Sequence, residues 1–266
     1  MNNNKQVYVD AVKSDFLENR STINKKFATS DFDSWIESII NKIKFSDVLD
    51  ICCGTGNQLT LYAKKRETLT LTGVDISHDS LDVAHSRLSE IDVIDKTLLI
   101  EEKMDNIFSS DAISKSKFDL ISCFYGLYYA DNVALLLDKG VEHLTDNGHI
   151  LIVGPYGENN KAFFNILEKY FELPELVYRS SCTFMENEVL PALAPKLKLE
   201  KKYFLNKIRY PDVSSVMDYW KSTTFFNGKF EKNVQDDLEI HFQSNSEFVI
   251  EKHIMAIIAK NDNKSN

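Results

Sequence analysis

The sequence lacks any concentration of basic residues. It contains 31 Lys and Arg against 40 Asp and Glu, which gives a formal net charge of −9 over 266 residues. Because proteins that bind nucleic acids contact phosphates through Lys and Arg, this balance argues against DNA or RNA as a partner. No apolar run reaches membrane-spanning length, and the polar segment Met1 to Gln6 lacks the apolar core of a signal peptide. We expect a cytoplasmic protein without a membrane partner.

Cysteine is scarce, and its spacing does not fit the usual zinc or disulfide patterns. The four cysteines, Cys52, Cys53, Cys123 and Cys182, form no C-x-x-C pair. We therefore interpret them as reduced thiols of a cytoplasmic protein and expect no metal site. The histidines likewise form no recognisable Ser-His-Asp arrangement with other residues.

Short apolar runs alternate with amphipathic segments through the first 153 residues. The runs predict strands, and the segments between them carry apolar residues at helical spacing, with Ser77 as the N-cap of one helix. Such alternation indicates a parallel sheet with right-handed crossovers. The predicted strands span residues 45–51, 69–75, 96–100, 118–124 and 149–153, the last of them after a turn at 146–148.

After Pro155 the alternation ends. Two long apolar segments, Leu197 to Tyr210 and Phe248 to Ala259, predict strands on either side of a helical insertion. We expect five parts in all: a helical arm or lid over 1–45, an α/β core over 46–154, a helical cap over 155–196, C-terminal strands with a helical insertion over 197–260, and a disordered tail over 261–266.

A glycine turn after the first predicted strand organises the chain. Asp50 lies near the end of an apolar run, and the segment Cys52 to Gly56 that follows contains two glycines and leads into a helix. Glycines allow a tight turn and the close approach of a ligand, and the free N–H groups of the helix face the same crevice. The turn is therefore a candidate cradle for a nucleotide-type cofactor.

The segment from Asp50 to Gly56 resembles the first motif of class I S-adenosylmethionine-dependent methyltransferases, an acid followed by G-x-G-x-G. Cys52 stands where the family has the first glycine. The similarity covers residues 47–153, and the terminal strand pair matches in outline. The resemblance implies an α/β fold with a Rossmann-like, seven-stranded, mostly parallel sheet, an antiparallel final hairpin and helical lid elements. It also implies S-adenosyl-L-methionine as cofactor and methyl transfer as the reaction.

On this resemblance, cofactor-binding roles pass to residues at successive strand ends. Gly54 and Gly56, with Cys52 beside them, let the backbone approach the methionine end of the cofactor. Asp50 orients this turn and reaches the amino group through water. Asp75, at the end of the second strand, accepts hydrogen bonds from both ribose hydroxyls.

Further cofactor contacts follow from the same resemblance. Ile76 covers the adenine face, and Asp105, with Asn106 beside it, accepts from the adenine amino group. Phe27 resembles the aromatic residue that closes over the methionine end, although an ordinary hydrophobic residue at a helix entry explains Phe27 equally well.

Catalysis in such a family is mostly positioning of the acceptor atom in line with the departing sulfur. Tyr125 and Tyr128 follow the fourth predicted strand and are the candidates for this role, through an aromatic wall or a phenolic hydrogen bond. Packing of such a tyrosine against the next helix is the alternative. The expected partner is a small-molecule acceptor that is methylated at an O or N atom.

Other functions remain open from the sequence. Asp75 alone equally fits an acid that binds the ribose of a nicotinamide cofactor, although the fingerprint G-x-G-x-x-G needs a small residue where the chain has Leu59. A methyltransferase that acts on a protein side chain needs an open groove. A non-catalytic protein that binds S-adenosylmethionine shows no turnover with any acceptor.

Overall fold

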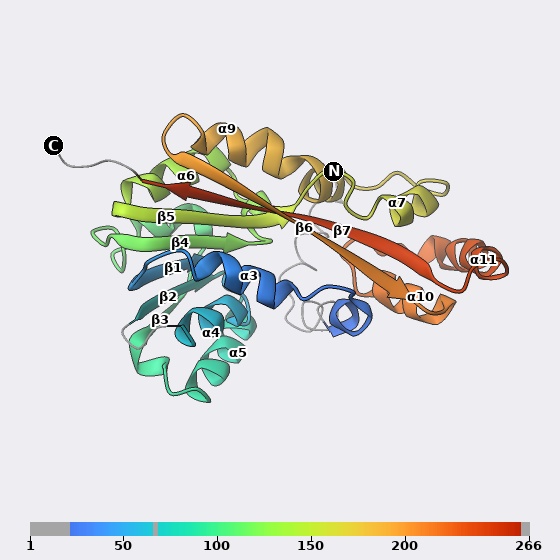
Figure 1. Cartoon of the computed structure of the whole chain (residues 1–266), viewed down its shortest axis with the longest axis horizontal. Helices are drawn as coiled ribbons and strands as arrows, with labels where there is room; N and C mark the ends of the chain where they lie inside the picture. The colour runs from blue at the N-terminus through green and yellow to red at the C-terminus, as the bar shows by residue number, and fades with distance from the viewer. Residues whose placement is uncertain (1–21, 66–68, 262–266) are drawn as a thin grey trace. The chain divides into compact units, whose positions relative to one another are not determined.

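One sheet of seven strands is the frame of the computed structural model, which describes residues 22–65 and 69–261. The strands are β1 Asp47–Ile51, β2 Thr70–Asp75, β3 Thr97–Glu101, β4 Phe118–Phe124, β5 Leu144–Pro155, β6 Lys198–Tyr210 and β7 Phe248–Lys260. Their order is β3-β2-β1-β4-β5-β7-β6 (Figure 1). β1 to β5 pair in parallel, and β7 is antiparallel to β5 and β6. The predicted α/β fold with an antiparallel final hairpin is confirmed.

Two compact units make up the described chain. Unit 1 contains residues 22–32, 155–183 and 204–254, and unit 2 contains residues 33–65, 69–154, 184–203 and 255–261. β6 and β7 each contribute residues to both units. Residues 1–21 of the predicted N-terminal arm lie outside the described residues, and the predicted division into five parts stays a prediction.

Helices follow the strands before Pro155 as the alternating pattern predicts. Ser77 Oγ accepts a hydrogen bond from Ser80 N at 3.3 Å, which confirms the predicted N-cap, and Asn132 Oδ1 accepts from Leu135 N at 3.0 Å in the same way. Such caps satisfy N–H groups that have no partner within the helix. The helices are α3 Phe32–Ile40, α4 Asn57–Ala63, α5 His78–Ser89 and α6 Val133–Glu142, with short 3₁₀ turns η1 Ile94–Lys96, η2 Met104–Ser109 and η3 Leu127–Tyr129.

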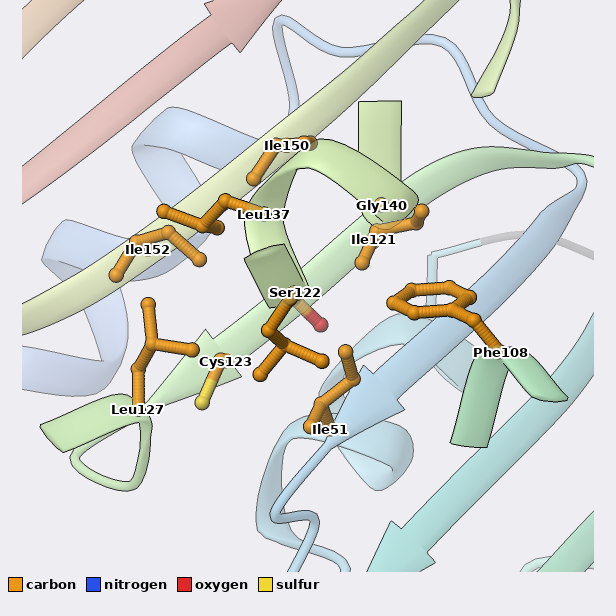
Figure 2. Close-up of a pocket in the computed structure, with 11 residues that line it drawn as sticks. Ile51, Phe108, Ile121, Ser122, Cys123, Leu127, Leu137, Gly140, Ile150 and Ile152 are labelled. Carbon is orange, nitrogen blue, oxygen red and sulfur yellow. The ribbon is translucent and has the colours of Figure 1, made fainter. Parts of the chain in front are cut away.

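The core of unit 2 is formed by the central strands and by buried side chains of α3, α4, α5 and α6. β4 is apolar and almost wholly buried along its length, as a strand covered on both faces should be. A cavity of about 10 Å³ remains between α6 and strands β1, β4 and β5, and Figure 2 shows the apolar side chains that line it. A space of this size holds at most one water molecule, so it is a packing defect and not a ligand site.

The start of β5 differs from the prediction. The strand was expected from His149 after a turn at 146–148, but it begins at Leu144. Its pairing with β4 passes from Phe118↔Leu144 to Leu120↔His149 through an irregularity that absorbs the extra residues. A Cβ on Gly148 would lie 2.9 Å from the carbonyl oxygen of Phe118. This glycine therefore marks a close approach of two strands, and not a turn.

Unit 1 has its own aromatic core. Trp220 is fully buried, its Nε1–H donates to the carbonyl of Phe225 at 3.3 Å, and its ring meets that of Phe163 edge-on. The surrounding helices are α7 Lys161–Leu167, α8 Glu175–Tyr178, α10 Val213–Lys221 and α11 Glu231–Phe242, with the π-helical segment η4 Arg179–Thr183 and the 3₁₀ turn η6 Gly228–Phe230. The segments η5 Met185–Val189, which is also π-helical, and α9 Leu190–Leu193 belong to unit 2.

Asn261 is the last residue that the structure describes, and it is bound to β5. The backbone N–H of Asn261 donates to the carbonyl of Gly148 at 2.9 Å, and its side-chain amide donates to that of Thr145 at 3.1 Å. The prediction that the disordered tail begins at residue 261 is wrong for Asn261, because this residue satisfies two carbonyls of β5. Residues 262–266 lie outside the described residues.

Candidate active site

The turn that joins β1 to α4 holds three residues in the left-handed conformation. φ is +59° at Cys52, +51° at Gly54 and +78° at Gly56. A Cβ on Gly56 would lie 3.0 Å from the Cβ of Ala84, so this glycine also lets α5 approach the turn. Glycine adopts such φ values without the steric penalty of a side chain. The residue type therefore fits the backbone at two of the three positions, and Cys52 is the exception.

Asp75, at the end of β2, fixes this turn from the neighbouring strand. Its Oδ2 accepts from the N–H of Gly54 at 2.8 Å, and its Oδ1 accepts from the N–H of Ser77 at 2.9 Å. Burial raises the pKa of Asp75, and the backbone hydrogen bonds oppose that rise. Each carboxylate oxygen has acceptor capacity for a further donor. Ile76 follows directly, and its side chain is 42% exposed.

Asp50 is the most deeply buried acid of the turn. It is 1% exposed, and its Oδ1 accepts a hydrogen bond of 2.6 Å from the hydroxyl of Ser122, its neighbour across the β1–β4 pairing. Its Oδ2 is buried and has no hydrogen-bond partner in the described part of the chain. Burial raises the pKa of Asp50 to about 7, although the hydrogen bond from Ser122 acts in the opposite direction.

Asp105 lies in η2, just beyond β3. Its Oδ1 accepts from the N–H of Asp131 at 2.8 Å, so one oxygen ties η2 to the segment before α6. Its Oδ2 is buried and accepts no hydrogen bond from the described residues, with Lys103 Nζ at 3.9 Å. Asn106 is exposed and donates to Glu102 at 3.1 Å. Asp105 thus has one oxygen in structural use and one available as an acceptor.

The two candidate tyrosines differ in their surroundings. Tyr125 directly follows β4 with φ +54°, and its N–H donates to the carbonyl of Val153 at 2.9 Å. Tyr128 packs edge-on against Tyr129 and Phe184, with ring centroids 4.7 and 5.7 Å apart. These rings lie in η3 and next to η5, so packing of a tyrosine against the helix after β4 stays a prediction. Tyr125 has an uncommon backbone conformation.

Phe27 belongs to unit 1. Its ring lies 5.4 Å from that of Tyr210, and Lys26 Nζ lies 5.0 Å from its centroid. It packs against the aromatic core of that unit. The role of Phe27 over the cofactor stays a prediction.

Comparison with known proteins identifies the family. A family described as "Methyltransferase domain" matches residues 14–168, which is more than half of the chain. The chain belongs to the methyltransferase-domain family. This confirms the resemblance drawn from the turn after β1.

Two solved structures are similar to this chain in fold. A provisionally assigned methyltransferase from Bacillus halodurans C-125 superposes with a TM-score of 0.59 at 15% identity, over 85% of this chain and 97% of that one. The plantazolicin methyltransferase BpumL, crystallised with SAH and a triazolic desmethylPZN analog, gives 0.52 at 19% identity, over 97% and 98%. These likenesses support the fold assigned above.

A relative in sequence is an uncharacterized protein of Haemophilus influenzae. It is 26% identical over 115 residues, which are 43% of this chain and 44% of that protein. The chain therefore spans less than half the length of this relative. In residues 22–65 and 69–261 no helix is long and apolar enough to cross a membrane, and no group of three or more His, Cys, Asp or Glu is suited to a metal ion.

For a methyltransferase-domain protein, the predicted residues fall in a consistent place. Those in unit 2 lie at or just beyond the carboxyl ends of β1, β2, β3 and β4, along one edge of the parallel strands. They are Asp50, Cys52, Gly54, Gly56, Asp75, Ile76, Asp105, Asn106, Tyr125 and Tyr128. Open parallel sheets bind their ligands at this edge.

Sequence reasoning missed Ser122 and Gly126. Ser122 is the hydrogen-bond donor to Asp50, and Gly126 borders Cys52. A hydroxyl inside the otherwise apolar run Phe118–Phe124 was a usable signal for a buried polar partner. Gly126 carried no such signal, because the contact that requires it is formed by a residue 74 positions earlier in the chain.

Proposed function

We propose that this chain is an enzyme that transfers a methyl group from S-adenosylmethionine to an O or N atom of a small-molecule acceptor. The observation that carries the proposal is the double use of Asp75, whose two oxygens hold Gly54 and Ser77 in place at the end of β2. This arrangement pre-forms a turn with acceptor capacity still free on the carboxylate. Membership of the methyltransferase-domain family supports the same function.

The residues at the strand ends fit the nucleoside part of S-adenosylmethionine. Asp75 would accept from the ribose hydroxyls with its remaining lone pairs, and the exposed side chain of Ile76 would cover the adenine. Asp105 would accept from the adenine amino group, and its buried Oδ2, which faces Lys103 but accepts no hydrogen bond from the described residues, supports that role. A ligand donor at this position would supply the hydrogen bond that this oxygen lacks.

The methionine part would lie against the turn itself. Gly54 has nothing within 4 Å of an ideal Cβ position, so its open side leaves space beside the backbone. When bound, the cofactor supplies a methyl group already activated by the sulfonium. The chain's own contribution is to hold the turn, to place the acceptor near Tyr125 and Tyr128, and to exclude water. Phe27 is proposed as the aromatic residue over the methionine end.

A small molecule is proposed as acceptor because the chain carries a formal net charge of −9, which disfavours a nucleic acid. The relative BpumL is a methyltransferase of plantazolicin, which shows that the fold is used for natural-product acceptors. A hydroxyl acceptor would need a general base, whereas an amine needs only to lose a proton.

The competing nicotinamide function is disfavoured by packing. Leu59 is fully buried, and its Cδ1 lies 2.7 Å from the position of a Cβ on Gly73 in β2. In the dinucleotide fingerprint the close approach of helix and strand comes from a glycine on the helix. In this chain the glycine, Gly73, is on strand β2, and the residue on helix α4 is Leu59. The helix therefore lacks the glycine that the dinucleotide fingerprint requires.

Calorimetric titration tests the proposal. The protein is titrated with S-adenosylmethionine, S-adenosylhomocysteine, NAD and NADP, each against the natural chain and Asp75→Ala. Micromolar binding of the first two, lost in the variant, is expected. Binding of a dinucleotide alone would refute the proposed function. A screen of small-molecule acceptors and of proteins with labelled S-adenosylmethionine then separates the remaining classes: transfer to protein alone overturns the small-molecule acceptor, and no transfer at all indicates a non-catalytic binder.

A further inference from the structure

Cys52 and Gly126 have residue types that their backbone conformations do not explain. Cys52 has φ +59°, where glycine is favoured and a side chain is strained. Gly126 has φ −129° and ψ −29°, so it does not use the positive-φ region that favours glycine. The backbone therefore does not require a glycine at 126, and it opposes a cysteine at 52. Both residue types need another explanation.

Packing between the two residues supplies it. A Cβ built on Gly126 would lie 2.5 Å from the Cβ of Cys52 and 2.7 Å from its Sγ. Real Cβ atoms do not approach other heavy atoms so closely, so Gly126 is needed because the side chain of Cys52 occupies the space. The same position lies 3.5 Å from the Sγ of Cys123 in β4. Cys52 is thus inserted against the end of β4.

The other side of Cys52 faces the segment after β3. Its Sγ lies 3.9 Å from the Sδ of Met104, the residue before Asp105. Gly126, in turn, follows Tyr125 directly. The side chain of Cys52 therefore contacts one chain neighbour of Asp105 and one chain neighbour of Tyr125, at the end of β1. A glycine at position 52, as in the family's first motif, would make neither contact.

We propose that Cys52 is a positioning residue that holds the turn after β1, the segment of Asp105 and the segment of Tyr125 in one fixed arrangement, with Gly126 as its required counterpart. This inference rests on the proposed function and extends it to a residue pair. The hydrogen bond with Cys123 and burial raise the pKa of Cys52, so the thiol is protonated at neutral pH. Cys52 acts by contact and not as a nucleophile.

Because the two residues share one space, the effect of Gly126→Ala on the affinity for S-adenosylhomocysteine should be opposite in sign when residue 52 is cysteine and when it is glycine. In the natural chain the new Cβ clashes with Cys52, so the affinity for S-adenosylhomocysteine falls by about thirtyfold or more, within the range of coupled contacts. Cys52→Gly removes the contacts and lowers the affinity by about tenfold. In the double variant Cys52→Gly/Gly126→Ala the Cβ at 126 fills the vacated space, and the affinity returns to within about threefold of the natural chain.

The experiment measures the dissociation constant of S-adenosylhomocysteine and the thermal unfolding midpoint for these four proteins. Cys52→Ala keeps the Cβ that faces Gly126 but removes the Sγ contact with Met104, so its affinity should lie between those of the natural chain and Cys52→Gly. Gly157→Ala is the matched control, because Gly157 has φ +59° and nothing within 4 Å of an ideal Cβ. It adds backbone strain without a clash, so it lowers the midpoint and leaves the affinity unchanged.

The outcomes separate the inference from the proposed function. Equal harm from Gly126→Ala in both backgrounds, or natural affinity in Cys52→Gly, overturns the inference. If Gly126→Ala alone does not fold, Cys52→Gly, Cys52→Ala and the double variant still decide it. If the natural chain binds no S-adenosylhomocysteine, the proposed function fails and the positioning role with it. The unfolding midpoints then still test the packing of Cys52 against Gly126, because recovery in the double variant needs no ligand.

Discussion

Replacing Asp50 with asparagine is expected to change how the stability of unit 2 depends on pH. Asp50 is 1% exposed, and its pKa is raised from 3.8 to about 7 by burial. Between these two values the folded chain keeps a proton that the unfolded chain has released. Stability contributed by the protonated carboxyl is therefore fully present below pH 3.8, falls as the pH rises, and is lost above about 7.

The size of the effect follows from the same shift. Each pKa unit corresponds to about 1.4 kcal/mol, so the natural chain loses about 2 kcal/mol of unfolding free energy through this group between pH 5 and pH 7, where the folded carboxyl is half ionised. The asparagine introduced by Asp50→Asn carries no titrating proton and can still accept from the hydroxyl of Ser122. Its amide takes the place of Oδ2, which has no hydrogen-bond partner among the described residues, and an amide left unpaired there costs about 1–3 kcal/mol at every pH. The difference between the two proteins should therefore rise by about 3 kcal/mol from pH 5 to pH 8 in favour of the variant.

Urea denaturation at pH 5, 6, 7 and 8 measures this difference. Trp35 lies in unit 2 with Asp50, and Trp220 lies in unit 1, so the fluorescence of Trp35 in a Trp220→Phe background reports on the relevant unit. Asp79→Asn, at an exposed position of α5, is the matched control and should give a difference that does not vary with pH. A flat difference for Asp50→Asn would refute the reasoning, because it would mean that the buried carboxyl is ionised throughout.

Other substitutions test the packing. Gly140→Ala in α6 places a Cβ no closer than 3.7 Å to its neighbours, so unfolding in urea should require about 0.5–1 kcal/mol more; an unchanged or lower midpoint contradicts this. Gly148→Ala drives a Cβ to 2.9 Å from the carbonyl of Phe118 and should cost about 1–3 kcal/mol in the same assay, and a neutral result would show that the β4–β5 irregularity yields. Trp220→Phe leaves the Phe225 carbonyl without its donor and should lower the thermal midpoint of unit 1, with about 1–3 kcal/mol lost; full stability would show that the core closes around the smaller ring.

The sequence was most informative where local pattern and burial agree. β4 was predicted with its observed bounds, because a strand buried on both faces leaves a nearly continuous apolar run, here interrupted by Asp119 and Ser122. Ser77 was predicted as an N-cap because capping depends on a residue and its immediate neighbours. β5 was misjudged at its start, because the residues Asp146 to Gly148 have the composition of a turn while pairing with β4 keeps them in the strand.

Long-range contacts set the limit of sequence reasoning at the site. The order of the acids along the strand ends was visible, since each follows an apolar run. The partners of those acids were not, because Ser122 and Gly54 reach Asp50 and Asp75 only through strand pairing and a turn. The elevated pKa of Asp50 likewise depends on burial, which no spacing of residues expresses.

The sharing of β6 and β7 between the two units has a consequence for biosynthesis. Unit 1 is assembled from segments that end at Ile254, and unit 2 needs residues from Met255 onward. A ribosome that has made the first five strands has therefore completed neither unit, and both receive their last strand residues from β7. Translation stalled before Phe248 should leave a nascent chain that both chaperones and proteases recognise. The reason is that the edges of β5 and β6 that pair with β7 would stay without a partner strand.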